Sequence, residues 1–292
     1  RTALVTTRGF RDVLEFRRLR FPDLFSLDYT PPKPLVPRRQ RFEVIERMMP
    51  DGSIRQPLDD VSVESMLEKL EQLQPEAIAI CLLHSYANPI HERKVVEAVK
   101  NRFPNLYVSG SIDVLPEIRE YERTSTTVIN SYIGPIVDSY LKSMQKRLDH
   151  ANMPVPISIM QSNGGVMSYA AARRSPARII ESGPAAGVVE ALRLADRIGL
   201  EDVITFDMGG TTAKASLIEH GKPSLTTEYE VGAGIQLSNR LVKGRGHALK
   251  LPVIDIAEVG AGGGSIVRVD PGGSLRVGPQ SAGAKPGPAC YR

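Results

Sequence analysis

Residues 206–218, FDMGGTTAKASLI, carry the strongest local signal in the chain. A short apolar strand ends at Asp207, a polar turn follows, and a second apolar strand resumes, which predicts a β-hairpin. The turn consists of Gly209, Gly210, Thr211 and Thr212. Glycines without Cβ atoms can turn their N–H groups towards an anion, and threonine hydroxyls add donors. Asp207 would face a phosphate through a divalent cation or an attacking water. The alternative is a plain hairpin with a glycine turn.

A second glycine-rich loop follows another strand. Residues 259–270, VGAGGGSIVRVD, contain Gly260, Gly262, Gly263, Gly264 and Ser265. So many glycines suit a loop on which a nucleoside or phosphate lies directly against the main chain. No Gly-Lys-Ser/Thr follows, so the segment is no P-loop, and the next residues alternate as a strand rather than opening a Rossmann helix.

A third segment predicts the start of a helix. In residues 181–195, ESGPAAGVVEALRLA, Ser182 and Gly183 precede a proline near the first helical position. The free N–H groups there would favour an anion, and the small residues would permit a close approach. Close packing against another helix is the alternative.

The rest of the pattern indicates an α/β protein. Predicted strands at 2–7, 75–85 and 106–116 alternate with amphipathic helices, one of them at 62–74 with Ser62 as its N-cap. Residues 28–39 hold four prolines and predict an extended connector. A long helical pattern at 122–148 contains Gly134-Pro135, which should kink or break it. We predict two parts, 1–150 and 151–292, and expect the chain to be incomplete at both ends.

Composition excludes several classes of protein. The 292 residues are 41% hydrophobic with a formal charge of +4, and basic runs interleaved with aromatics are absent, so we expect no nucleic-acid partner. No apolar run is long enough to span a membrane, so we expect no membrane partner either. The cysteines, Cys81 and Cys290, form neither a disulfide framework nor a CxxC site, which favours a cytoplasmic location.

Several stretches together resemble one family. They are TTRGFRDVLEF, QSNGGVMS, ESGPAAGVVEA, FDMGGTTAKASLI, VGAGGGSIVRVD and VGPQSAGAKPGPACY. Their order is that of the hydantoinase A and 5-oxoprolinase group, which includes acetone carboxylase subunits. The resemblance implies an actin/hexokinase-like ATPase fold, with two lobes of mixed sheets flanked by helices. Residues 1–150 would be the remainder of the N-terminal lobe, with an inserted α/β segment and the long helix. Residues 151–292 would be the second ATPase lobe, with the phosphate hairpin and the glycine-rich loop.

The same resemblance implies a nucleotide site. DMGGTTAK matches the second phosphate hairpin of the family, and GAGGGS matches its adenosine-side loop. ATP and Mg²⁺ are the implied cofactors, with Asp207 as the catalytic and metal-binding residue. Many relatives have aspartate at the position of Lys214, and a lysine could contact a phosphate directly but cannot bind a cation.

The implied activity is ATP-dependent opening of a cyclic amide, hydantoin or 5-oxoproline, by phosphorylation of the carbonyl oxygen. A B-type hydantoinase subunit or domain is the implied partner, within an oligomer, and we expect the 292 residues alone to be inactive. The alternatives are an ATP-dependent ketone carboxylase subunit, a small-molecule kinase, and a nucleotide-gated binding module without small-molecule chemistry. The sequence does not choose among these substrates.

Overall fold

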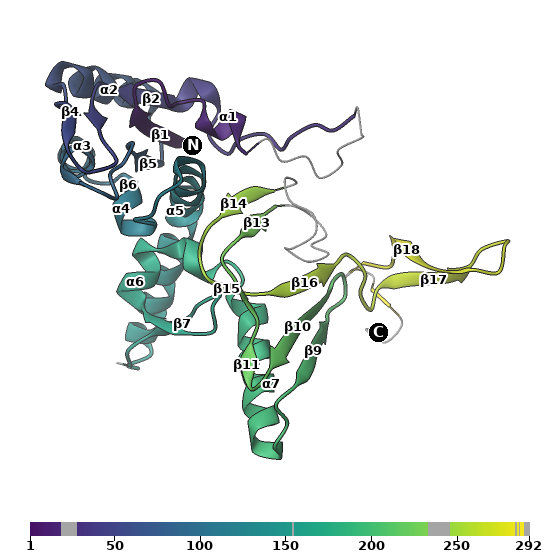
Figure 1. The fold of residues 1–292 in the computed structure, drawn as a ribbon. Coiled ribbons are helices and arrows are strands. Elements are labelled where there is room, and N and C mark those ends of the chain that lie inside the picture. Colours follow the sequence, from purple (N-terminus) through teal and green to yellow (C-terminus); the bar gives the residue numbers. More distant parts are fainter. Residues whose placement is uncertain (19–27, 154, 233–245, 284, 286, 289–292) are drawn as a thin grey trace.

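The computed structural model describes residues 1–18, 28–153, 155–232, 246–283, 285 and 287–288. Its first half is built on a parallel sheet and its second half on antiparallel sheets and ribbons, joined by a long central helix (Figure 1). The α/β class predicted from the alternation of strands and helices is confirmed.

The parallel sheet has four strands in the order β2-β1-β5-β6. Every neighbouring pair is parallel, as in Ala3 opposite Ile78 and Ile78 opposite Val108. The strands are β1 (Thr2–Thr7), β2 (Arg41–Val44), β5 (Ala77–Cys81) and β6 (Tyr107–Gly110). β1 and β5 are buried along their whole length, which explains the continuous apolar sequence of β5, AIAIC; β1 also buries the threonines Thr2, Thr6 and Thr7.

Helices cover both faces of this sheet. Val5 and Ile80 point into one core with helices α2 (Asp60–Leu73) and α3 (Ile90–Arg102). Leu4 and Cys81, one residue along their strands, point to the opposite face, where Val128 of helix α5 (Glu120–His150) packs. The alternation follows from the period of two along a strand.

Short elements complete the first half. They are α1 (Val13–Phe16), the 3₁₀ turn η1 (Arg38–Gln40), the hairpin of β3 (Arg47–Met48) and β4 (Ile54–Gln56), and α4 (Ser111–Val114). The predicted N-cap of α2 was wrong, because Asp59 caps the helix. Its carboxylate accepts the N–H of Ser62 at 2.8 Å, and the Ser62 hydroxyl donates back to the Asp59 carbonyl at 2.7 Å.

Helix α5 continues through Gly134-Pro135, so the predicted break is wrong. Packing on both sides of the proline holds the helix together, with Val128 buried against the parallel sheet and Leu141 buried beyond it. Gly134 is required by a close approach. A Cβ atom there would lie 2.2 Å from the ring of Tyr107, whose hydroxyl donates to the Arg173 carbonyl.

A connecting region leads to the second sheet. It contains β7 (Ser158–Met160), β8 (Val166–Ser168), α6 (Tyr169–Arg174), η2 (Pro176–Ile179) and α7 (Ser182–Ile198). The helix predicted from the SGP sequence is confirmed, and it begins at Ser182. Asp138 of α5 accepts a hydrogen bond from Arg173 Nε of α6 at 2.6 Å, which joins the two helices.

The second sheet is antiparallel, with β10 at its centre. β9 (Val203–Met208) pairs with one edge of β10 (Ala213–Glu219), and β16 (Ile256–Val259) and β11 (Lys222–Pro223) pair with the other. Helix α7 packs Val188 against Ile218 and Ile256 on one face. On the opposite face Ile204 and Phe206 are 72% and 67% exposed.

Three two-stranded ribbons surround this sheet. They are β12 (Leu225–Thr226) with β15 (Val253–Ile254), β13 (Tyr229–Val231) with β14 (His247–Leu249), and β17 (Ser265–Val269) with β18 (Leu275–Ser281). The β17–β18 hairpin, yellow in Figure 1, projects away from the rest. The β13–β14 ribbon instead packs Tyr229 and Leu249 against Ile129 of α5.

Other expectations stand as follows. The division of the chain at residue 150 stays a prediction. Cys81 is buried, and Cys290 lies outside the described residues. In the part of the chain that the structure describes, no helix is both long and apolar enough to cross a membrane.

Candidate functional site

The hairpin predicted at 206–218 is present. β9 and β10 pair without a bulge from Met208 opposite Ala213 to Val203 opposite Ile218. The N–H of Gly209 donates to the carbonyl of Thr212 at 2.9 Å and closes the turn. Thr211 is exposed at the tip and Thr212 is half-buried. The predicted hairpin is therefore confirmed, and its polar tip is accessible.

The second glycine loop lies directly against this tip. The N–H of Gly263 donates to the carbonyl of Gly209 at 2.9 Å, and that of Gly264 donates to Gly210 at 2.8 Å. Within the loop, Ser265 Oγ accepts the N–H of Gly262 at 3.0 Å. The two glycine segments, about fifty residues apart in the sequence, thus form one backbone surface.

The glycines of this surface divide into two groups. A Cβ atom on Gly262 would lie 2.6 Å from the Gly209 oxygen, and one on Gly264 would lie 2.9 Å from the Gly210 oxygen. The contact between the loops therefore requires glycine at 262 and 264. Around Gly209 and Gly263 the nearest atoms would be 3.8 and 3.7 Å away, and neither has a left-handed φ. Packing does not require glycine at these two positions.

A row of charged side chains crosses the sheet beside the hairpin tip. Lys214 of β10 lies opposite Asp207 of β9 on one side and Glu258 of β16 on the other, so the three side chains share one face. Lys214 Nζ is 3.6 Å from a carboxylate oxygen of Glu258 and 3.6 Å from one of Glu181. The lysine is held between two carboxylates, and a direct contact between Lys214 and a phosphate stays a prediction.

Glu181 links this row to two other elements. It immediately precedes Ser182 at the start of α7, and its second oxygen accepts the hydroxyl of Tyr229 at 2.9 Å. Ser182 is half-buried, and Gly183 has no atom within 4 Å of a Cβ placed on it. Glu181 therefore brings the start of α7 beside the hairpin.

A cavity of about 400 Å³ lies between α7 and the antiparallel sheet. Asp207 and Lys214 line it from the sheet, and Pro184 and Gly187 line it from the helix. Its size falls within the range of small-molecule sites. The cavity joins the hairpin and the start of α7, two of the three segments singled out by the sequence. Gly260, the first glycine of the second loop, is not one of the described residues that line this cavity.

Divalent-metal binding has limited support from the donor set. In the described part of the chain, no three acidic, histidine or cysteine side chains gather as a metal site. Asp207 is exposed, so a cation held through water by this carboxylate fits the geometry. The assignment of Asp207 to Mg²⁺ remains a prediction.

Sequence reasoning missed three residues of the site: Glu181, Glu258 and Tyr229. The alternation of side chains along β16 sets the face on which Glu258 lies. Its place beside Lys214, however, depends on the pairing of β16 with β10, two strands that lie far apart in sequence. Glu181 precedes the SGP signal by one residue and could have been included with it. Nothing in the sequence around Tyr229 indicates that its hydroxyl reaches α7.

Family models match nearly the whole chain. The model described as hydantoinase/oxoprolinase matches residues 123–292, and the model of the hydantoinase/oxoprolinase N-terminal region matches residues 1–103.

Curated relatives are similar over the same range. An uncharacterised protein of Methanocaldococcus jannaschii is 48% identical over 99% of this chain and 42% of its own length. Caprolactamase subunit alpha of Pseudomonas jessenii is 34% identical over 100% of this chain and 40% of its own length. 5-Oxoprolinase 1 of Arabidopsis thaliana is 31% identical over 100% of this chain and 23% of its own. The chain therefore spans less than half the length of these relatives.

Two solved structures share the fold. The ATP-dependent caprolactamase from Pseudomonas jessenii matches with a TM-score of 0.82 and 34% identity, over 99% of this chain and 40% of that one. Nucleotide-free acetone carboxylase matches with a TM-score of 0.75 and 29% identity, over 97% and 39%. The predicted actin/hexokinase-like ATPase fold is confirmed by these matches. With both family models matched in chain order, the chain belongs to the hydantoinase/oxoprolinase family.

Proposed function

We propose that this chain forms the nucleotide-binding part of an ATP-dependent enzyme that opens a cyclic amide. The nucleotide lies in the cavity between α7 and the antiparallel sheet and against the joined glycine turns. The enzyme acts with a B-type hydantoinase partner, as a subunit of a larger oligomer.

The observation that carries the proposal is Gly187. This glycine lies within α7, where alanine would stabilise the helix by about 1 kcal/mol. A Cβ atom on Gly187 would meet nothing within 4 Å, so packing among the described residues does not exclude a side chain. Gly187 lines the cavity that also contains Asp207 and Lys214. A ligand lying against the helix backbone gives a reason for glycine here.

The hairpin surface supports the same ligand. On the joined turns Gly209 and Gly263 have room for a Cβ atom, with the nearest atoms 3.8 and 3.7 Å away, and Thr211 is exposed beside them. Backbone N–H groups at such a bare surface suit the phosphates of ATP. Asp207 would hold Mg²⁺ through water, and Lys214 would balance the charge of its carboxylate neighbours.

ATP supplies a phosphoryl group that activates the carbonyl oxygen of the amide towards ring opening. The residues of this chain bind and orient the phosphates. Caprolactamase and 5-oxoprolinase are both named for cyclic amides, which favours this substrate class over ketones.

The binding test uses two variants of helix α7 and two of the hairpin. Gly187→Leu should weaken the binding of ATP with Mg²⁺ at least tenfold, because the leucine side chain would occupy the cavity. Glu190→Leu adds the same side chain to the same helix at an exposed position outside the cavity and should leave affinity unchanged. Asp207→Ala and Gly210→Val test the hairpin. Unchanged affinity in Gly187→Leu, Asp207→Ala and Gly210→Val would contradict the nucleotide assignment.

The activity test uses the complete polypeptide with its copurifying subunits. ATP hydrolysis should rise with hydantoin, 5-oxoproline or caprolactam, and the ring-opened acid should accumulate. A rise with acetone and bicarbonate instead would identify a ketone carboxylase. Accumulation of a stable phosphorylated small molecule would identify a kinase, and stimulation by unfolded peptide would identify a nucleotide-gated binding module.

A further inference from the structure

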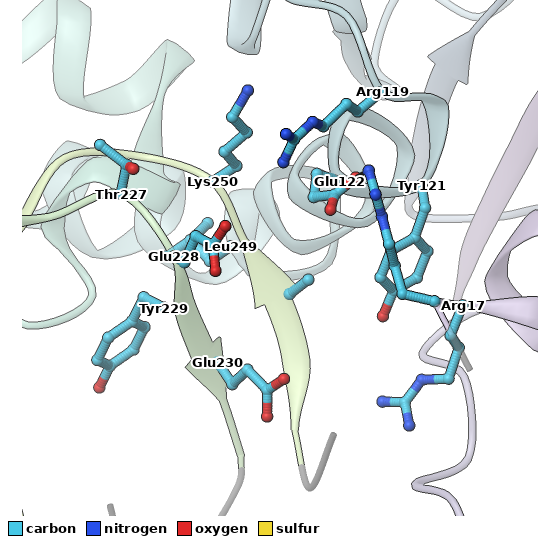
Figure 2. Close-up of a pocket in the computed structure, with 12 residues that line it drawn as sticks. Arg17, Arg119, Tyr121, Glu122, Thr227, Glu228, Tyr229, Glu230, Leu249 and Lys250 are labelled. Carbon is cyan, nitrogen blue, oxygen red and sulfur yellow. Dashed lines mark hydrogen bonds and ion pairs between the residues drawn. The ribbon is translucent and has the colours of Figure 1, made fainter. Parts of the chain in front are cut away.

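A second pocket lies where the two halves of the chain meet. It is formed by the end of α1, the start of α5 and the β13–β14 ribbon (Figure 2). Its volume is about 40 Å³, room for roughly three water-sized groups. A carboxylate, with one carbon and two oxygens, has this size. Because the lining is separate from Asp207, Gly187 and the glycine turns, the pocket is distinct from the proposed nucleotide site.

Most charged groups around this pocket already have partners. Arg18 pairs with Glu122 at 2.6 Å, and Lys250 pairs with Glu117. Glu230 accepts the N–H of Gly246 at 3.0 Å, and Arg17 donates to the carbonyl of the same residue. These groups therefore have ion-pair or hydrogen-bond partners without a ligand.

Arg119 differs from its neighbours. Its guanidinium has no ion pair or hydrogen bond with any residue that the structure describes. Figure 2 shows the side chain extending from the start of α5 across the top of the pocket towards Lys250. The ammonium of Lys250 is already paired with Glu117, so among the described residues that line this pocket Arg119 is the cation without a partner that an anion could bind.

The backbone at this pocket is strained in two places. Arg119 has φ 77° and ψ 93°, and Arg17 has φ 51° and ψ −131°. Residues other than glycine avoid these angles, and such outliers cluster at binding sites, where the surrounding structure holds them. Both outliers are arginines that line the same pocket. The strain supports a role in binding for this pair.

The lining also limits the charge of the anion. Glu122, Glu228 and Glu230 line the pocket together with the arginines. The cationic side chains of the lining are Arg17, Arg18, Arg119 and Lys250, so the pocket has one more positive than negative charge. This balance matches a ligand with a single negative charge better than a phosphate dianion. Burial raises the pKa of the Tyr121 hydroxyl at the pocket wall, although the nearby Arg17 opposes the effect. Tyr121 therefore remains protonated at neutral pH and can donate to an oxyanion.

We propose that this pocket binds the carboxylate group of a small monocarboxylic acid, with the Arg119 guanidinium as its anchor. Arg119 donates to both carboxylate oxygens, and the hydroxyl of Tyr121 can donate a further hydrogen bond. The proposal does not rest on the proposed nucleotide site, since the two share no lining residue.

Acetate is the probe for the test. Binding of ¹³C-labelled acetate, followed by NMR line broadening on the complete protein, should be reversible and should be competed by propionate. Acetamide has the same shape without the charge and should not compete. Methyl phosphate should compete more weakly than propionate at pH 8, where it is a dianion. Equal competition by acetamide, or stronger competition by methyl phosphate, would overturn the assignment.

The variants separate a binding role from a structural one. Arg119→Gln should weaken acetate binding roughly 10- to 100-fold, since it removes a charged hydrogen-bonding partner. Arg119→Lys keeps the charge but loses the planar fork and should give an intermediate affinity. Arg55→Gln removes an exposed arginine on β4 and should change nothing. If Arg119→Gln does not fold, the acetate affinities of the other proteins test the proposal. Arg119→Lys should bind more weakly than the wild type and Arg55→Gln, and equal affinity in all three contradicts the proposal.

Discussion

The backbone N–H of Gly264 donates to the carbonyl oxygen of Gly210 at 2.8 Å, so the turn after β16 is hydrogen-bonded to the turn between β9 and β10. Neither turn can move without breaking bonds to the other. A ligand bound to the hairpin tip would therefore meet a surface that is already ordered, and little conformational entropy would be lost on binding.

The two groups of glycines predict opposite results for the same substitution. Gly262→Ala should destabilise the protein by about 1–3 kcal/mol, because the new methyl would lie 2.6 Å from the Gly209 oxygen. Gly263→Ala should change stability little, because its nearest atom lies 3.7 Å away. Urea unfolding of both variants measures the difference, and equal stabilities would show that the turns separate easily.

At Gly263 a large side chain should affect nucleotide binding rather than stability. Gly263→Leu should fold and should weaken ATP binding, because its side chain would project from the surface proposed to meet the nucleotide. Calorimetric titration of the folded variant is the measurement. Normal ATP affinity in a stable Gly263→Leu protein would leave the loop with a purely structural role.

Gly134→Ala should reverse the usual effect of this substitution in a helix. Alanine normally stabilises a helix interior by about 1 kcal/mol, but here the methyl would lie 2.2 Å from the Tyr107 ring. We expect a net loss of about 1–3 kcal/mol in the free energy of unfolding. The substitution should cost less in a Tyr107→Ala background, and a double-mutant cycle measures that coupling. Additive effects would mean that the ring moves aside freely.

His247 predicts a pH dependence of stability. Burial, assisted by the charge of Arg17, holds the pKa of His247 below its ordinary value. As the pH falls below about 6.5, the unfolded chain binds a proton that the folded chain does not, so stability is lost through the window below pH 6.5. His247→Gln should lose less stability than the wild type between pH 7.5 and 5.5, by up to about 1.4 kcal/mol. Parallel urea-unfolding curves for the two proteins across that range would contradict this linkage.

Glu181 and Tyr229 should be energetically coupled. The Tyr229 hydroxyl donates to the Glu181 carboxylate at 2.9 Å, and Lys214 lies 3.6 Å from the same carboxylate. Tyr229→Phe and Glu181→Gln should each destabilise the protein, and the double variant should lose about 1 kcal/mol less than the sum. The matched cycle of Tyr229→Phe with Glu190→Gln, an exposed glutamate of α7 whose carboxylate lies 3.9 Å from Arg193, should show no coupling.

The local features of this fold could be predicted from the sequence, whereas its long-range contacts could not. The hairpin at 206–218 and the helix beginning at Ser182 are set by nearby residues, and both predictions are confirmed. The contact of Gly262 with Gly209 depends on the pairing of β16 with β10, which no local pattern encodes. The N-cap of α2 was misassigned because Asp59 and Ser62 are both good caps and exchange hydrogen bonds with each other. The pocket at Arg119 combines three distant segments and had no sequence signal.

Helix α5 places two successive residues in different hydrophobic cores. Val128 packs with Leu4 and Cys81 of the parallel sheet, whereas Ile129 packs with Tyr229 and Leu249 of the β13–β14 ribbon. Local unfolding of α5 around Val128 and Ile129 would expose both cores together. Amide hydrogens of β5 and of β14 should therefore exchange through a shared opening event, with the two regions behaving as one cooperative unit of unfolding.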